Sequence, residues 1–160
     1  MLITLHRREN IGNGIKNICL ALYELAINHS NLEIVIPVHL NPNIQKPITD
    51  YLGNINNIKL IEPQDYLSFI FLLQKSQLII TDSGGLQEEA ANLRKPVLIT
   101  RNITERPESL NETVKLIGTD KTLIIEEVNH MLSRLHNYAS IHPESLNTPE
   151  LILEKLHHLL

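Results

Sequence analysis

Short apolar runs alternate with longer amphipathic segments along the chain, and this alternation constrains the fold more than any other feature. The short runs have the length and branched side chains of buried strands, and the longer segments repeat apolar residues at helical spacing. Strands that alternate with helices form βαβ units around a parallel sheet. The runs predicted as strands are 2–5, 33–38, 58–61, 78–81, 96–100 and 114–117, and the predicted helices are 15–26, 42–52, 66–75, 86–93, 122–135 and 149–160.

These elements predict an α/β fold, a Rossmann-like parallel sheet of about six strands with helices on both faces. The length of 160 residues suits one domain. We expect residues 1–137 to form this Rossmann-like lobe and residues 138–160 to form a tail that ends in a helix.

Composition narrows the classes of function. A net charge of −4 and an aromatic content of 4% argue against a nucleic-acid-binding surface. No apolar run approaches the roughly 20 residues that span a bilayer, and charged residues follow directly after residue 5, so we expect no membrane segment, no signal peptide and a cytoplasmic protein. Cys19 is the only cysteine, and the histidines lack helical metal-ligand spacing, so we expect no metal and no cofactor.

The residues after each predicted strand are the candidates for a site, because ligands bind beyond the carboxyl ends of parallel strands. The sharpest signal is Asp82-Ser83-Gly84-Gly85, where a strand runs straight into a helix. Glycines let a ligand approach the backbone, and a helix N-terminus attracts anions, so we expect a phosphate or diphosphate there. Glu89, one turn into the helix, is available for sugar hydroxyls. The alternative is that Ser83 only caps the helix and the glycines form a tight turn.

Basic side chains follow two other predicted strands. His6, Arg7 and Arg8 come after the first strand, and Arg106 lies in the segment after the fifth. Arginine binds phosphate through paired hydrogen bonds, and histidine donates to phosphate or acts as an acid near neutral pH. Strand alternation would allow only one of Arg7 and Arg8 to reach a shared pocket. The alternative is a solvated edge whose arginines pair with neighbouring glutamates.

Taken together, these segments resemble the C-terminal half of the non-hydrolysing UDP-N-acetylglucosamine 2-epimerases, in that family's order and spacing. The segments that carry the resemblance are 4–10 (TLHRREN), 37–43 (PVHLNPN), 63–67 (PQDYL), 81–90 (TDSGGLQEEA), 95–98 (KPVL), 101–108 (RNITERPE) and 118–120 (GTD). The resemblance implies a glycosyltransferase-B-like architecture, in which two Rossmann-like lobes hold a nucleotide sugar between them. This chain would be the C-terminal, UDP-binding lobe.

The resemblance also implies roles for single residues. It implies that a serine and two glycines hold the diphosphate, a glutamate the ribose, a glutamine and a phenylalanine the uracil region, and an arginine the ligand. The implied UDP-binding residues are Ser83, Gly84, Gly85, Glu89, Gln64, Phe69 and Arg106. His6 is the implied catalytic residue, placed to stabilise or protonate the departing UDP, with Arg7 and Arg8 as additional candidates. His39 matches a position that touches a second, regulatory UDP-N-acetylglucosamine in some members.

The family reaction interconverts UDP-N-acetylglucosamine and UDP-N-acetylmannosamine by elimination and re-addition of UDP. It needs an acid and a base at C2, which the family supplies as carboxylates from the other lobe. Those carboxylates have no counterpart here. We therefore expect a truncated or split half that binds UDP, is inactive alone and needs an N-terminal lobe on a separate chain, with a homodimer as a further expected assembly.

Two other interpretations remain open from the sequence. The chain could be a catalytically inactive remnant or UDP-binding module. It could also be one lobe of a nucleotide-sugar glycosyltransferase, since those enzymes use a glycine turn and a helix glutamate as well. The segments 6–10 and 104–108 favour the epimerase family over this last alternative.

Overall fold

The structure, a computed structural model, describes residues 1–141 and shows the predicted parallel α/β sheet. The strands are β1 (Leu2–Thr4), β2 (Ile34–Pro37), β3 (Ile58–Ile61), β4 (Ile79–Thr81), β5 (Val97–Ile99) and β6 (Val114–Leu116). The helices are α1 (Asn13–Asn28), α2 (Pro42–Leu52), α3 (Tyr66–Lys75), α4 (Gly84–Asn92) and α5 (Lys121–Ile141), with short 3-10 turns η1 (Arg8–Asn10) and η2 (Pro107–Ser109). All neighbouring strands of the six-stranded sheet run parallel.

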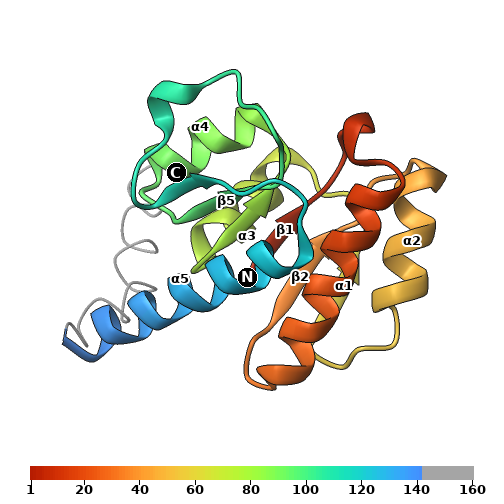
Figure 1. Cartoon of the computed structure of the whole chain (residues 1–160), viewed down its shortest axis with the longest axis horizontal. Helices are drawn as coiled ribbons and strands as arrows, with labels where there is room; N and C mark the ends of the chain where they lie inside the picture. Colours follow the sequence, from red (N-terminus) through yellow and green to blue (C-terminus); the bar gives the residue numbers. More distant parts are fainter. Residues whose placement is uncertain (142–160) are drawn as a thin grey trace, which may run out of the picture.

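Helices cover both faces of this sheet, as expected. Helices α1, α2 and α5 contribute to one buried apolar cluster, and α3 and α4 contribute to the other; Figure 1 shows α5 and α1 on the near side of the sheet. Along β1 and β4, Ile3 and Ile80 belong to the first cluster, whereas Leu2 and Ile79 belong to the second. Successive strand residues face opposite sides, so both sides of a central strand must be apolar.

The strand order β3-β2-β1-β4-β5-β6 places the reversal of the sheet between β1 and β4. Leu2 pairs with Ile79 and Thr4 with Thr81, so the two strands end at the same level. The chain then leaves β1 toward one face and β4 toward the other, which opens a crevice at their carboxyl ends. The segments after β1 and after β4 therefore lie side by side, although more than 70 residues separate them in the sequence.

Most strands are shorter than predicted by a residue at one or both ends, and helix α1 is two residues longer at each end. Two further differences affect the site and the boundary of the lobe. Helix α4 begins at Gly84 instead of residue 86, so both glycines lie in its first turn. Helix α5 continues to Ile141, past the expected end of the lobe at residue 137. The division into 1–137 and 138–160 stays a prediction, because the helix expected at 149–160 lies outside the described residues.

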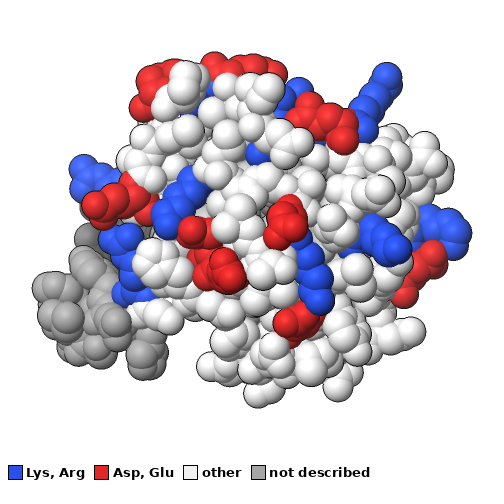
Figure 2. Space-filling model, viewed as in Figure 1, with Lys and Arg blue, Asp and Glu red and all other residues white. Residues whose placement is uncertain are grey.

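The surface charge, the length of the helices and the grouping of metal-ligand side chains bear on the predicted classes of function. On the face seen in Figure 2, acidic and basic side chains lie close to one another and neither sign forms a large patch. No helix within residues 1–141 is long and apolar enough to cross a membrane. The same part of the chain holds no group of three or more His, Cys, Asp or Glu side chains arranged to bind a metal ion.

Candidate functional site

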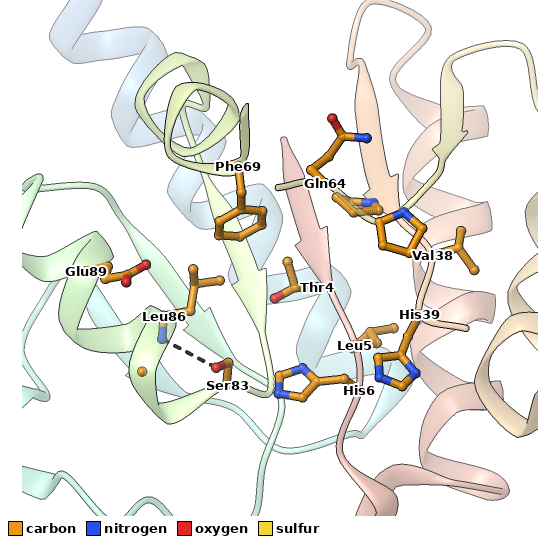
Figure 3. Close-up of a pocket in the computed structure, with 13 residues that line it drawn as sticks. Thr4, Leu5, His6, Val38, His39, Gln64, Phe69, Ser83, Leu86 and Glu89 are labelled. Atoms are coloured by element: carbon orange, nitrogen blue, oxygen red, sulfur yellow. Dashed lines mark hydrogen bonds between the residues drawn. The ribbon is translucent and has the colours of Figure 1, made fainter. Parts of the chain in front are cut away.

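A pocket of about 380 Å³ opens at the carboxyl ends of the strands, at the crevice between β1 and β4. Figure 3 shows side chains from four separate segments converging on it. The predicted site residues that line it are His6, His39, Gln64, Phe69, Ser83, Gly85 and Glu89. Residues that lie up to about 80 positions apart in the sequence thus meet in this pocket, because parallel strands present their carboxyl ends at one edge of the sheet.

The N-terminus of α4 forms one wall of this pocket. Ser83 caps the helix, since its Oγ accepts a hydrogen bond from the Leu86 N–H at 3.4 Å. The Ser83 N–H donates to Thr81 Oγ1 at 2.9 Å. Helix geometry leaves the N–H groups of Gly84 and Gly85 without intrahelical partners. Capping and anion binding are therefore compatible, because the serine hydroxyl proton and these two N–H groups remain available.

Gly84 and Gly85 leave steric room at the helix end; neither is needed for an unusual backbone conformation. Neither has a positive φ, in contrast to Gly12 and Gly118. A Cβ added at Gly85 would meet nothing within 4 Å, so this position faces open space in the pocket wall. A Cβ added at Gly84 would collide with the guanidinium of Arg106. The expected tight turn is thus a helical first turn, with the glycines leaving room for a ligand and for an arginine.

Two arginines flank this helix end. Arg106 packs over Gly84 and pairs with Glu88, and this hydrogen bond raises its pKa above the usual arginine value. Arg7 Nη2 would lie 3.9 Å from a Cβ at Gly84. The Arg7 Nε is buried, with no hydrogen-bond partner within residues 1–141. The two guanidiniums, with the helix dipole, give this corner a positive potential suited to a phosphate.

Arg8 and Arg101 lie differently. Arg8 is exposed in η1 and does not line the pocket. Because this segment is a 3-10 turn and not a strand, the alternation of side chains along a strand is not what keeps Arg8 out of the pocket. Arg101 is buried and pairs with Glu9 at 2.6 Å and with Glu105 at 3.3 Å. The ion-pairing alternative therefore describes Arg101, whose guanidinium ties the segment after β5 to the segment after β1.

An aromatic ring and an amide lie on the far side of the pocket, and the Glu89 carboxylate lies one turn along α4. Phe69 and Glu89 are half-buried, and Figure 3 places Phe69 across the pocket from His6 and His39. Gln64 is exposed, and its Nε2 donates to the Glu62 carbonyl at 2.7 Å. A ring that can stack on a base, with polar groups on either side, suits a nucleoside next to the anion site.

His39 shares the pocket with His6. Their rings stack with centroids 6.4 Å apart and an interplanar angle of 24°. The Nδ1 of His39 accepts a hydrogen bond from the Asn41 N–H at 3.0 Å. The structure thus places His39 beside the proposed diphosphate position, and the regulatory contact implied by the resemblance stays a prediction.

The sequence reasoning assigned no role to two buried polar residues that shape the site, although Asp82 belongs to the segment it singled out. Asp82 is fully buried and accepts hydrogen bonds from the segment after β1. Gln87, 1% exposed, accepts from Thr104 Oγ1 at 3.0 Å and donates to Ser109 and to the Arg106 carbonyl. Gln87 thereby fixes the loop that carries Arg106. The sequence signal that could have revealed Gln87 is a polar residue on the face of the predicted helix that faces the core.

The chain is similar in sequence to one family of known proteins. Residues 1–148 match the family model described as UDP-N-acetylglucosamine 2-epimerase. The chain is 49% identical over 142 residues to the UDP-N-acetylglucosamine 2-epimerase of Escherichia coli K12, covering 88% of this chain and 38% of that protein. It is 53% identical over 133 residues to the enzyme of Neisseria meningitidis serogroup A, covering 82% and 36%. The chain therefore spans less than two fifths of these relatives.

Solved structures of UDP-N-acetylglucosamine 2-epimerases also match this chain. The N. meningitidis UDP-GlcNAc 2-epimerase bound to UDP-GlcNAc matches with a TM-score of 0.81 and 53% identity, over 82% of this chain and 36% of that one. The Staphylococcus aureus MnaA–UDP structure matches with a TM-score of 0.80 and 42% identity, over 84% and 38%. The E. coli heptosyltransferase WaaC shares the fold alone, with a TM-score of 0.57 and 13% identity, over 83% and 42%. This chain belongs to the UDP-N-acetylglucosamine 2-epimerase family.

Proposed function

We propose that this chain is the UDP-binding lobe of a non-hydrolysing UDP-N-acetylglucosamine 2-epimerase. The observation that carries the proposal is the N-terminus of α4, which opens with Ser83-Gly84-Gly85 at the switch point of the sheet and has two guanidiniums beside it. Helix N-termini with glycines in their first turn bind phosphate groups through free N–H groups. The family match, together with relatives whose structures contain UDP or UDP-GlcNAc, supports the same ligand.

We place one part of UDP at each wall of the pocket. The diphosphate receives hydrogen bonds from the Gly84 and Gly85 N–H groups and the Ser83 hydroxyl, and Arg106 and Arg7 neutralise its charge. Glu89, one helical turn further on, accepts hydrogen bonds from the ribose hydroxyls. On the other wall, Gln64 and Phe69 contact the uracil. This order follows the pocket from the helix end to the aromatic side in Figure 3.

His6 is the proposed catalytic residue of this lobe. In the elimination, a base removes the C2 proton, the C1–C2 double bond forms, and the C1–O bond breaks with its electron pair on the UDP oxygen. His6 donates a proton to the departing diphosphate, which lowers the cost of that negative charge. Re-addition reverses these steps with a proton delivered to the opposite face of C2. The acid and base at C2 are the carboxylates of the second lobe.

Exposed apolar residues at the carboxyl edge of the sheet support the proposal that a second lobe covers the pocket. Three large apolar side chains at the carboxyl edge of the sheet are highly exposed, namely Leu40 at 74%, Leu67 at 79% and Ile103 at 75%. Exposed apolar groups that lie together beside a ligand pocket are typical of an interaction surface. The relatives are more than twice as long as this chain, which leaves room for such a lobe. The homodimer and the cytoplasmic location stay predictions.

A complementation assay tests the proposal. Purified chain is assayed for conversion of UDP-N-acetylglucosamine, alone and after addition of the separately produced N-terminal lobe of the N. meningitidis relative. We expect no turnover by the chain alone and turnover by the mixture, with loss of turnover in a mixture that carries His6→Gln. Turnover by the chain alone would contradict the two-lobe mechanism. UDP binding without turnover in any mixture would instead favour the alternative of a UDP-binding module.

A further inference from the structure

The carboxylate of Asp82 contacts the His6 ring and does not line the pocket. Asp82 is 0% exposed, and its Oδ1 lies 3.0 Å from His6 Nδ1. Its carboxylate also accepts from the His6 N–H at 3.1 Å and the Arg7 N–H at 2.9 Å. The Nδ2 of the buried Asn10 donates to Oδ2 at 3.1 Å. Every partner of this carboxylate within residues 1–141 is therefore a donor or a histidine nitrogen.

These partners decide the charge of Asp82. Burial raises its pKa, but the hydrogen bonds from the His6 side chain and the Arg7 N–H, with the charge of His6, outweigh burial and hold the pKa below its usual value. Asp82 is therefore ionised at neutral pH. An ionised carboxylate only accepts hydrogen bonds, so the nitrogen 3.0 Å away must carry a hydrogen.

We propose that Asp82 is a positioning residue for His6: it holds the neutral imidazole in the tautomer protonated at Nδ1 and leaves Nε2 to exchange a proton with the diphosphate. This inference rests on the proposed function for the identity of the proton acceptor. It assigns Asp82 no contact with the substrate. Figure 3 shows the His6 ring between Ser83 and His39, at the pocket wall where the diphosphate is proposed to bind.

The proton transfer balances without a further reactant. His6 enters the elimination as an imidazolium, with hydrogens on both ring nitrogens. As the C1–O bond breaks, the Nε2 proton passes to the departing diphosphate oxygen, and a neutral ring remains with its hydrogen on Nδ1. Asp82 stays ionised throughout and stabilises the imidazolium before the transfer. In the re-addition, the same proton returns to Nε2.

The substitution Asp82→Asn changes this arrangement in a defined way. The Asn10 amide and the N–H groups of His6 and Arg7 still need an acceptor oxygen at the position of Oδ2. The asparagine oxygen satisfies them, so its NH₂ group faces His6 Nδ1. A donor at that place requires Nδ1 to accept, and the ring proton moves to Nε2.

Histidine ring NMR measures this change directly. Chain labelled with ¹⁵N in its histidines is examined at about pH 8, where an ordinary histidine is neutral. His6→Gln identifies the His6 signals. We expect the Nδ1–H tautomer in the wild type and the Nε2–H tautomer in Asp82→Asn. Asn10→Ala is the matched control, because it removes a buried hydrogen bond of the same carboxylate and leaves the His6–Asp82 pair in place, so the tautomer should not change.

Two outcomes would overturn the inference. One is an Nε2–H tautomer in the wild type, which decides the matter even if Asp82→Asn fails to fold. The other is the same His6 tautomer in the wild type and in folded Asp82→Asn. UDP is then titrated into the same wild-type sample. Absence of binding would count against the proposed function and would leave the tautomer result intact, so the two failures are distinguishable.

Discussion

Gly85 gives the sharpest test of the anion site at α4. It lies in the first helical turn, its φ is not positive, and an added Cβ meets no atom within 4 Å. We therefore expect Gly85→Asp and Gly85→Asn to fold without strain. An acidic residue in the first turn interacts favourably with the helix dipole, so the free energy of unfolding should be at least that of the wild type.

The expected loss of UDP affinity follows from the charge that the substitution places at the pocket wall. A carboxylate at position 85 lies about 5 Å from a phosphate bound to the first-turn N–H groups, and two such charges repel by about 1 kcal/mol in water or about 3 kcal/mol at an effective dielectric of about 20. The pocket is partly open to water, so we expect Gly85→Asp to raise the Kd for UDP by about 5- to 150-fold. Gly85→Asn has nearly the same size without the charge.

Isothermal titration calorimetry with UDP separates charge from size. We expect Gly85→Asn to lose much less affinity than Gly85→Asp, and the gap between the two variants to shrink as salt rises from about 0.05 M to about 0.5 M. Equal affinity of the wild type and both variants would refute the placement of the diphosphate. An equal loss in both variants, independent of salt, would show that Gly85 matters for space and not for charge.

Four further predictions concern the residues around this helix end. Gly84→Ala should keep the free energy of unfolding but displace Arg106 and weaken UDP binding, as measured by calorimetry. Glu88→Gln should release Arg106 from its ion pair with Glu88 and tighten UDP binding modestly, because an exposed ion pair is weak and screened by water. Gln87→Leu should lower the free energy of unfolding in urea by about 1–3 kcal/mol, because it leaves buried polar partners unpaired. The pKa of Asp82 is lower in the folded chain than in the unfolded chain, so the ionised carboxylate stabilises the fold above about pH 4, and this contribution is lost as the pH falls toward the pKa of the folded chain. The difference in the urea-measured free energy of unfolding between wild type and Asp82→Asn should therefore shrink over that pH range.

The sequence predicted the sheet and most of the pocket because their signals are local. Strand β3 and helix α3 begin and end where the apolar pattern predicted them, at Ile58–Ile61 and Tyr66–Lys75. Helix α4 was placed two residues too late, because glycines are poor helix formers and only the capping Ser83 and the packing of Arg106 reveal the true start. The pocket lining followed from the rule that ligands bind at the carboxyl ends of parallel strands.

The supporting contacts could not be predicted, because they join distant segments with no pattern between them. Asp82 meets its donors more than 70 residues away, and Arg101 pairs with Glu9 across 92 residues. The pairing of Arg101 with Glu105, by contrast, is local, at a spacing of four residues, and is the kind of pairing with a neighbouring glutamate that the sequence allowed as an alternative. Gln87 gave only a weak signal, a polar residue on a buried helix face, and its partners become clear only in three dimensions.

A titration of the ¹⁵N-labelled chain with UDP, followed through backbone amide signals, tests the central claim most directly. The account predicts saturable shifts at the first turn of α4, at Glu89, at Phe69 and at the segment after β1. The groove lined by Ile27, Ser30 and Asn54 shares no residue with the UDP pocket, so it should show no shifts and serves as an internal control. A folded chain whose amide signals do not respond to UDP, or respond only in that groove, would contradict the assignment of this lobe as a UDP-binding site.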